Sequence, residues 1–159
     1  MEHATLSLNH IHILRIDPGE DVLQSVEKFL KEARIRQAVV LGGYGTLAAY
    51  HLHWVTHNRI PTENAFGRGY GGIEILAMNG LVVDGAPHIH VALSTPDGGF
   101  GGHLEPGCVA YVLCEIFLGE VDGAHLGRCS VPVAVEGMGE GTISRLVFRQ
   151  GSIAASPEP

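Results

Sequence analysis

The sequence predicts a single α+β domain with a mostly antiparallel β-sheet, and three observations lead to this fold class. The chain has 159 residues, a length that suits one hydrophobic core. About six or seven segments have the length and apolar pattern of strands, whereas only one long segment has helical periodicity. Hydrophobic residues make up 45% of the chain and charged residues 17%, a balance that excludes an intrinsically disordered protein.

The chain begins with a strand, a turn and a long helix. Residues 5–16 carry apolar side chains on both parities, which is typical of a strand buried on much of both faces. Asp17-Pro18-Gly19-Glu20 ends this strand as a turn. Asp21 can then cap a helix whose apolar positions recur every three or four residues. These positions are Val22, Val26, Phe29, Leu30 and Ala33.

Glycines interrupt the next apolar segments. Residues 38–41 form a short buried strand, and residues 47–55 alternate as a second one. Between them, Gly43 to Ala48 has the spacing G-x-G-x-x-A of a dinucleotide-binding loop, which needs a helix that begins near Gly45. Because the alternation favours a strand at that place, we interpret the glycines as a bend between two strands.

The remainder of the chain is predicted as strands separated by turns. Residues 56–72 form a long exposed loop in which Arg68 is a candidate anion contact. The expected strands are residues 73–83, 88–95, 109–118 and 146–148. Residues 1–150 then make one domain, and residues 151–159 a flexible C-terminal tail.

Histidine is unusually frequent, with ten residues, as many as lysine and arginine together. His88 and His90 lie on one strand and project from the same face, about 6.6 Å apart, so that both imidazoles can reach one ion. Thr95-Pro96-Asp97-Gly98 has the residues of a type I turn, which folds the chain back as a hairpin. A simple reversal there places His103 directly across from His90.

The register of this hairpin has an alternative. A type I turn in a hairpin commonly carries a glycine bulge, which shifts the pairing by one residue and turns His103 to the opposite face. The glycines at positions 98, 99, 101 and 102 would allow a second bulge that restores the pairing. Sequence alone leaves both registers open.

In the first register, His88, His90 and His103 form a candidate metal site. Three histidines leave a fourth coordination position for water or substrate, as in catalytic zinc sites. Glu105 lies on the same parity as His103, and it is a candidate fourth ligand, ligand partner or general base. Zinc, nickel, copper and iron all accept imidazole ligands. The alternative for the His88-x-His90 pair is two strand histidines that bind carbonyls and water.

Other histidines repeat the same spacing. His10 and His12 form one such pair, and His51 and His53 form another, which His57 follows. No third ligand can be identified for either pair. We interpret them as partly buried or interface histidines, and less readily as a second site.

Charge and cysteine content indicate the compartment and the partners. The formal net charge of −7 opposes a DNA backbone, which disfavours direct duplex binding. The sequence shows no signal peptide and no apolar stretch of membrane-spanning length. Three cysteines without a C-x-x-C spacing predict reduced thiols in a cytoplasmic protein.

Several of these segments together resemble the PPC domain that plants and prokaryotes share. The specific part is His88-Ile89-His90 followed by Gly101-Gly102-His103-Leu104-Glu105-Pro106-Gly107, and the resemblance covers about residues 12–120. The other matching segments are Asp17-Pro18-Gly19-Glu20-Asp21, Gly43-Tyr44-Gly45, residues 73–80 and Glu115-Ile116. The resemblance implies an antiparallel sheet with short flanking helices, a compact homotrimer, and His88, His90 and His103 as metal ligands.

The resemblance also leads to two hypotheses about function. Plant members carry an AT-hook, and prokaryotic members are often labelled DNA-binding on that basis, but this sequence lacks the Arg-Gly-Arg-Pro hook. The first hypothesis is therefore a trimeric, zinc-binding module that is regulatory or associates with DNA through a partner. The second is a zinc-dependent lyase or hydrolase for a small molecule, in which Glu105 or Glu115 moves a proton, because the fold also resembles that of acetolactate decarboxylase.

Overall fold

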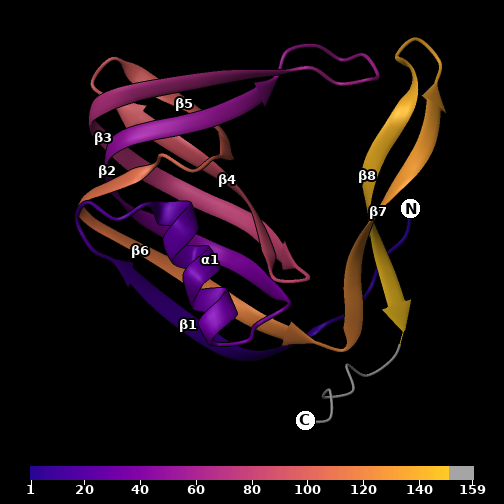
Figure 1. Cartoon of the computed structure of the whole chain (residues 1–159), viewed down its shortest axis with the longest axis horizontal. Helices are drawn as coiled ribbons and strands as arrows, with labels where there is room; N and C mark the ends of the chain where they lie inside the picture. The colour runs from indigo at the N-terminus through magenta and orange to yellow at the C-terminus, as the bar shows by residue number, and fades with distance from the viewer. Residues whose placement is uncertain (151–159) are drawn as a thin grey trace.

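The structure is a computed structural model, and residues 1–150 of it are described, so the predicted tail at 151–159 lies outside the described residues. Eight strands and one helix follow one another in this part of the chain (Figure 1). Their bounds are β1 Ser7–Ile16, α1 Val22–Glu32, β2 Ala38–Val55, β3 Asn64–Val83, β4 Ala86–Thr95, β5 Gly98–Leu104, β6 Val109–Asp122, β7 Ala124–Val135 and β8 Gly139–Gln150.

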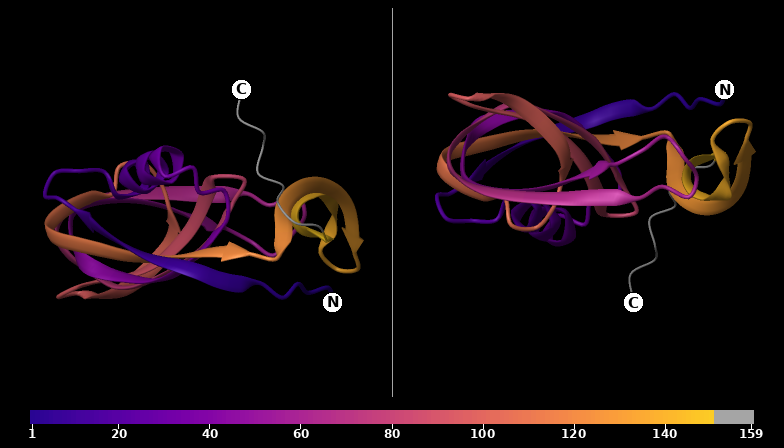
Figure 2. Two further views of the ribbon diagram at one scale, coloured as in Figure 1. Left: turned by 90° about the horizontal axis from the view of Figure 1, so that it is seen from below. Right: turned by 90° about the horizontal axis from the view of Figure 1, so that it is seen from above.

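Six of the strands form one antiparallel sheet in the order β1-β6-β2-β3-β4-β5. The end of β2 also pairs with β5, at Leu52 with Leu104 and at His53 with His103. Strands β2 to β5 therefore close on themselves, and the sheet curls strongly (Figure 2). This closure places β5 between β4 and the end of β2.

Helix α1 covers one face of the curled sheet (Figure 2). Its N-terminus is capped as predicted, because Asp21 accepts a hydrogen bond from the backbone N–H of Gln24 at 3.0 Å. The buried side of the helix consists of Val22, Leu23, Val26 and Leu30. Burial of such side chains contributes about 1.5–3 kcal/mol each, so packing fixes α1 on the sheet.

The prediction of short flanking helices needs correction. Within residues 1–150, α1 is the only α-helix, and the protein is more strand-rich than predicted. Three of the connections are too short for a helix: Asp84-Gly85 joins β3 to β4, Pro96-Asp97 joins β4 to β5, and Gly123 alone separates β6 from β7. A helix needs several residues to close its first hydrogen-bonded turn.

Two glycine-rich segments are strands and not the predicted bend and loop. Residues 38–55 form one continuous β2 whose pairing with β6 shifts register near the glycines. Strand β3 begins at Asn64, so the exposed loop spans only residues 56–63. A Cβ at Gly67 would lie 2.7 Å from the Trp54 ring, and one at Gly69 2.4 Å from the Tyr50 ring. The two aromatic rings lie across these glycines and supply the cross-strand packing.

Strands β7 and β8 form a separate hairpin beside the main sheet (Figure 1). The buried amide of Gln37 ties its base to the sheet, because Gln37 Nε2 donates to the carbonyl of Ala124 at 2.9 Å and Gln37 Oε1 accepts from the N–H of Leu126. Only residues 146–148 of this hairpin were predicted as strand. The second strand and the greater length depend on pairing that a single segment does not reveal.

All three cysteines are free thiols, as predicted. Burial raises the pKa of Cys108 to about 11 and that of Cys114 to about 12, so both stay protonated at neutral pH. Among the described residues, no helix has the length and apolar character needed to cross a membrane.

Candidate metal centre

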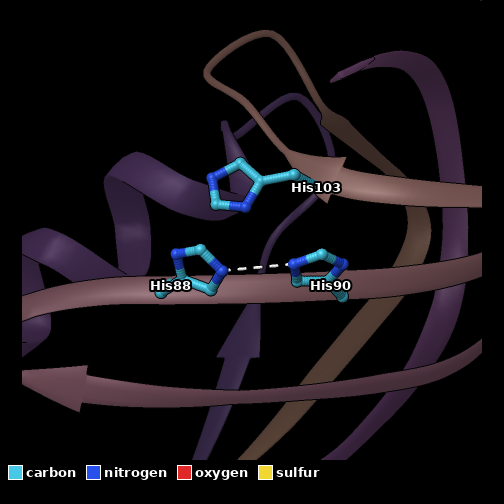
Figure 3. A group of neighbouring side chains, drawn as sticks. All are labelled: His88, His90 and His103. Atoms are coloured by element: carbon cyan, nitrogen blue, oxygen red, sulfur yellow. Dashed lines mark hydrogen bonds between the residues drawn. The ribbon is translucent and has the colours of Figure 1, made fainter. Parts of the chain in front are cut away.

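Strand β4 presents His88 and His90 on one face, as its sequence predicts. Ile89 and Val91, on the other parity, are buried at 0% and 4% exposure in the core. The two imidazoles point toward each other (Figure 3), and their Nε2 atoms lie 3.2 Å apart. Burial of the intervening apolar residues thus fixes the direction of both histidines.

The hairpin that follows has the unbulged register. Thr95 pairs with Gly98 across Pro96-Asp97, and the pairing continues without a shift to His90 and His103. The turn is held in part by the N–H of Asp97, which donates to the Thr95 hydroxyl at 3.3 Å. His103 therefore lies opposite His90, and the shifted register is not adopted.

Two glycines allow β5 to fit between β4 and β2. A Cβ at Gly101 would lie 2.4 Å from the carbonyl oxygen of Val91, and one at Gly102 2.9 Å from the carbonyl oxygen of His53. The indole of Trp54 also donates a hydrogen bond to the Gly101 carbonyl. The Gly-Gly-His string thus has a physical reason, because only residues without a side chain let both neighbouring strands approach His103.

His103 offers an unsatisfied ligand atom to the other two histidines. Its side chain is 17% exposed, and its Nδ1 atom is buried with no hydrogen-bond partner among the described residues. In Figure 3 this nitrogen faces the space between the Nε2 atoms of His88 and His90. One ring nitrogen from each of the three histidines lies within 4.8 Å of the others. Such a set of imidazole nitrogens suits a transition-metal ion.

The surroundings of the cluster lower the pKa of His103 and of His88, which favours the neutral form that binds metals. Burial is the main cause that lowers the pKa of His103 to about 4, and the charges of His88 and His53 add to it. Burial likewise lowers the pKa of His88, with the charge of Arg128 as the next cause. Protons therefore compete weakly for His103 at neutral pH.

His53 and Glu105 complete the cluster from β2 and from the residue after β5. His53 pairs with His103 across the strands, and the two ring centroids are 4.3 Å apart. His53 Nδ1 donates to Glu105 Oε1 at 2.6 Å, and the same oxygen lies 3.9 Å from His103 Nε2. Glu105, which the sequence offered as a candidate, thus lies at the site. His53 had only its H-x-H spacing as a signal, because the contact depends on closure of the sheet.

The structure does not bring Glu115 to the histidines. It lies on β6 opposite Tyr44 of β2 and accepts a hydrogen bond from the Tyr44 hydroxyl. Nine residues separate Tyr44 from His53, which is about 30 Å of strand path. Glu115 raises the pKa of Tyr44, and the two form an exposed pair outside the candidate metal site of their own chain.

The remaining predicted histidines have other partners. His10 and His12 face Glu120 at 3.5 and 3.2 Å. His51 Nδ1 binds the carbonyl of Pro106 at 2.8 Å, and His57 faces Glu63 at 3.6 Å. Arg68 is exposed on β3, opposite His51.

Comparison with known families identifies the fold that carries this cluster. The model of the Plants and Prokaryotes Conserved (PCC) domain matches residues 4–122, from before β1 to the end of β6. The chain belongs to the PCC domain family. This is the family that the motifs around His88 and His103 resemble under the name PPC. The match includes the whole six-stranded sheet and the histidine cluster, while β7 and β8 follow it.

Solved structures share the PCC fold over most of the chain. A hypothetical protein from Salmonella cholerae-suis is 26% identical, with a TM-score of 0.69, over 94% of this chain and 97% of that one. A plant- and prokaryote-conserved protein from Pyrococcus horikoshii is 31% identical, with a TM-score of 0.68, over 80% and 90%. A metal-containing protein from Archaeoglobus fulgidus is 24% identical, with a TM-score of 0.67, over 88% and 96%, and shows the fold alone.

A curated relative places a similar sequence inside a much larger protein. The bifunctional protein GlmU of Synechococcus sp. strain JA-3-3Ab is 32% identical over 113 residues. These cover 69% of this chain but only 17% of the relative. This chain therefore spans less than a fifth of the length of the curated relative that it matches.

Proposed function

We propose that this PCC protein is a metal-binding homotrimer in which His88, His90 and His103 hold zinc or another divalent transition metal. The observation that carries the proposal is the buried Nδ1 atom of His103, which has no hydrogen-bond partner among the described residues and faces two imidazole nitrogens 3.2 Å apart. A buried polar atom left in this way costs about 1–3 kcal/mol. A bound ion would satisfy all three nitrogens at once.

The site would be an open one. His88 and His90 are exposed, so the side of the ion away from His103 would face solvent or a ligand. Three protein ligands with a free position are the arrangement of catalytic and ligand-binding zinc sites. The metal-containing relative from Archaeoglobus fulgidus has the same fold, which agrees with this proposal.

An exposed apolar face supports the proposed trimer. On the outer side of the sheet, Ile13 of β1 pairs with Phe117 of β6, and the Phe117 ring centroid lies 5.9 Å from that of Tyr44. Ile13 is 69% exposed, which is unusual for such a cluster on a monomer. The face comprises Leu8, Ile11, Ile13, Leu41, Tyr44 and Phe117. We propose that other copies of this chain cover this apolar face. We also propose that the protein is cytoplasmic.

We propose association with DNA through a partner and not by direct duplex contact. A structural relative from Bacteroides thetaiotaomicron carries a provisional DNA-binding label, at 16% identity. The net charge of this chain is −7, and phosphate contacts need clustered lysine and arginine. A gel-shift titration with duplex DNA tests this point. A salt-dependent shift at physiological ionic strength would overturn it.

A second candidate function is a zinc-dependent enzyme for a small molecule, of the lyase or hydrolase type. The observation that favours it is Glu105, a carboxylate 3.9 Å from His103 and held by His53. A metal at the three histidines would supply Lewis-acid catalysis. Glu105 would hold or move a proton beside it, whereas Glu115 lies too far away in the same chain.

Metal analysis of the purified full chain tests the first proposal. We expect bound transition metal in the wild type and a strong loss in His88→Ala and in His103→Ala. His57→Ala is the matched control, because His57 faces Glu63 in the loop before β3 and lies outside the cluster. Equal metal content in the wild type and in both site variants would refute the site.

A further inference from the structure

The donors around His103 lie on two sides of its ring. Nδ1 faces His88 and His90, whereas Nε2 lies 3.9 Å from Glu105 Oε1, beyond hydrogen-bond distance. His53 adds a second imidazole on that side, with its ring centroid 4.3 Å from that of His103. One ligand atom each from His53, His103 and Glu105 lies within 4.8 Å of the others, so this group can also hold an ion.

We propose that His53, Glu105 and Nε2 of His103 form a second metal position, so that His103 bridges two ions. The inference rests on the proposed function only in using His103 as a shared ligand. Both nitrogens of one imidazole can bind metals when its N–H proton leaves to solvent. With metal–nitrogen distances of about 2.0–2.1 Å, the two ions would be about 6 Å apart.

The charges of the two groups favour this arrangement. The first group supplies only imidazole ligands, whereas the second contains a carboxylate, which lowers the repulsion between two divalent ions. Glu105 and His53 are 24% and 20% exposed, so their charges are screened less than those of surface residues. The bridging imidazolate and Glu105 together offset two of the four positive charges.

A simpler arrangement gives His53 and Glu105 a positioning role without a second ion. Their 2.6 Å hydrogen bond would then only orient the carboxylate beside His103. The two arrangements differ in the number of ions per chain and in the magnetic coupling between them. Both quantities can be measured without any assay of activity.

The first experiment counts ions. Full-length protein is stripped with a chelator and titrated with Co²⁺, with bound metal followed by visible absorption and by elemental analysis. We expect two ions per chain in the wild type, one in His53→Gln or Glu105→Gln, and one in His88→Ala. His51→Gln, on the same strand as His53 but bound to the Pro106 carbonyl, should keep two. Circular dichroism confirms that each variant is folded.

The second experiment tests the bridge with Cu²⁺ as a magnetic probe. Two Cu²⁺ ions that share an imidazolate couple their spins, so the integrated paramagnetic resonance signal should be well below the copper content. His53→Gln, with one ion, should give the full signal of its copper. Two ions with full signal in the wild type would refute the bridge.

The two proposals fail in different ways. One ion per wild-type chain that is retained in His53→Gln and lost in His88→Ala refutes the second position and leaves the three-histidine site intact. One ion that is lost in His53→Gln and retained in His88→Ala refutes the three-histidine site and the bridge together. No bound ion in the wild type refutes both proposals.

Discussion

Acidification should destabilise the metal-free protein through His103. Burial lowers the pKa of this side chain from 6.5 to about 4, whereas in the unfolded chain it returns to its ordinary value. Between these two pH values the unfolded state binds more protons than the folded state. The free energy of unfolding therefore has its full value above pH 6.5 and decreases as the pH falls toward 4.

The size of this effect follows from the shift. One pKa unit corresponds to 1.36 kcal/mol, so a shift from 6.5 to about 4 gives a loss of about 3 kcal/mol. The side chain is 17% exposed, so solvent screens it only in part. Such a loss is a large fraction of the 5–15 kcal/mol that is typical of domains.

Urea denaturation of the metal-stripped protein at pH 7 and at pH 4 measures this loss of unfolding free energy. All measurements use one protein concentration, because the apparent stability of an oligomer depends on concentration. The wild type should lose about 3 kcal/mol more than His103→Gln, whose side chain cannot titrate. His57→Gln, in the loop before β3, should behave as the wild type. An identical pH dependence in the wild type and His103→Gln would show that burial of His103 does not control its protonation.

Three further predictions concern the frame of the site and the apolar face. Gly101→Ala places a Cβ 2.4 Å from the Val91 carbonyl and should cost about 1–3 kcal/mol in thermal or urea unfolding. Gly99→Ala, whose Cβ would meet Leu93 O at an ordinary 3.7 Å, should change the stability little, and equal losses in the two variants would contradict the role of close strand approach. Asp21→Ala removes the cap of α1 and its bond to the N–H of Gly107, so we expect a loss of about 1–2 kcal/mol, whereas Asp21→Asn should lose less. Ile13→Glu introduces a charge into the exposed apolar face and should give monomers in sedimentation analysis, and an unchanged trimer would exclude this face as the interface.

Much of the candidate metal site was predictable because its contacts are local. The alternation of β4 fixes the common face of His88 and His90, and the Pro96-Asp97 turn brings back a strand only a few residues later. The choice between the two hairpin registers depends on contacts between residues that are far apart in the chain. Closure of β5 against β2 selects the register in which Gly101 and Gly102 face backbone atoms of the neighbouring strands.

The errors of prediction share one cause. The glycines of β2 and β3 predict a bend and a loop when each segment is considered alone, yet aromatic rings of a neighbouring strand cover Gly67 and Gly69. The flanking helices came from the family resemblance, and the connections after β3, β4 and β6 are too short to hold them. Glu115 follows the family pattern in sequence, but it lies on β6, opposite the other half of a long β2.

The sequence by itself determined the family, the capped helix, the facing pair on β4 and the reduced cysteines, because each depends on residues close together in the chain. Only the tertiary structure decided that His53 and Glu105 join His103 and that Glu115 does not. The reason is that β2 is long and pairs with β6 near one end and with β5 near the other. Its two halves therefore have different neighbours, and no spacing along the chain reveals which residues meet.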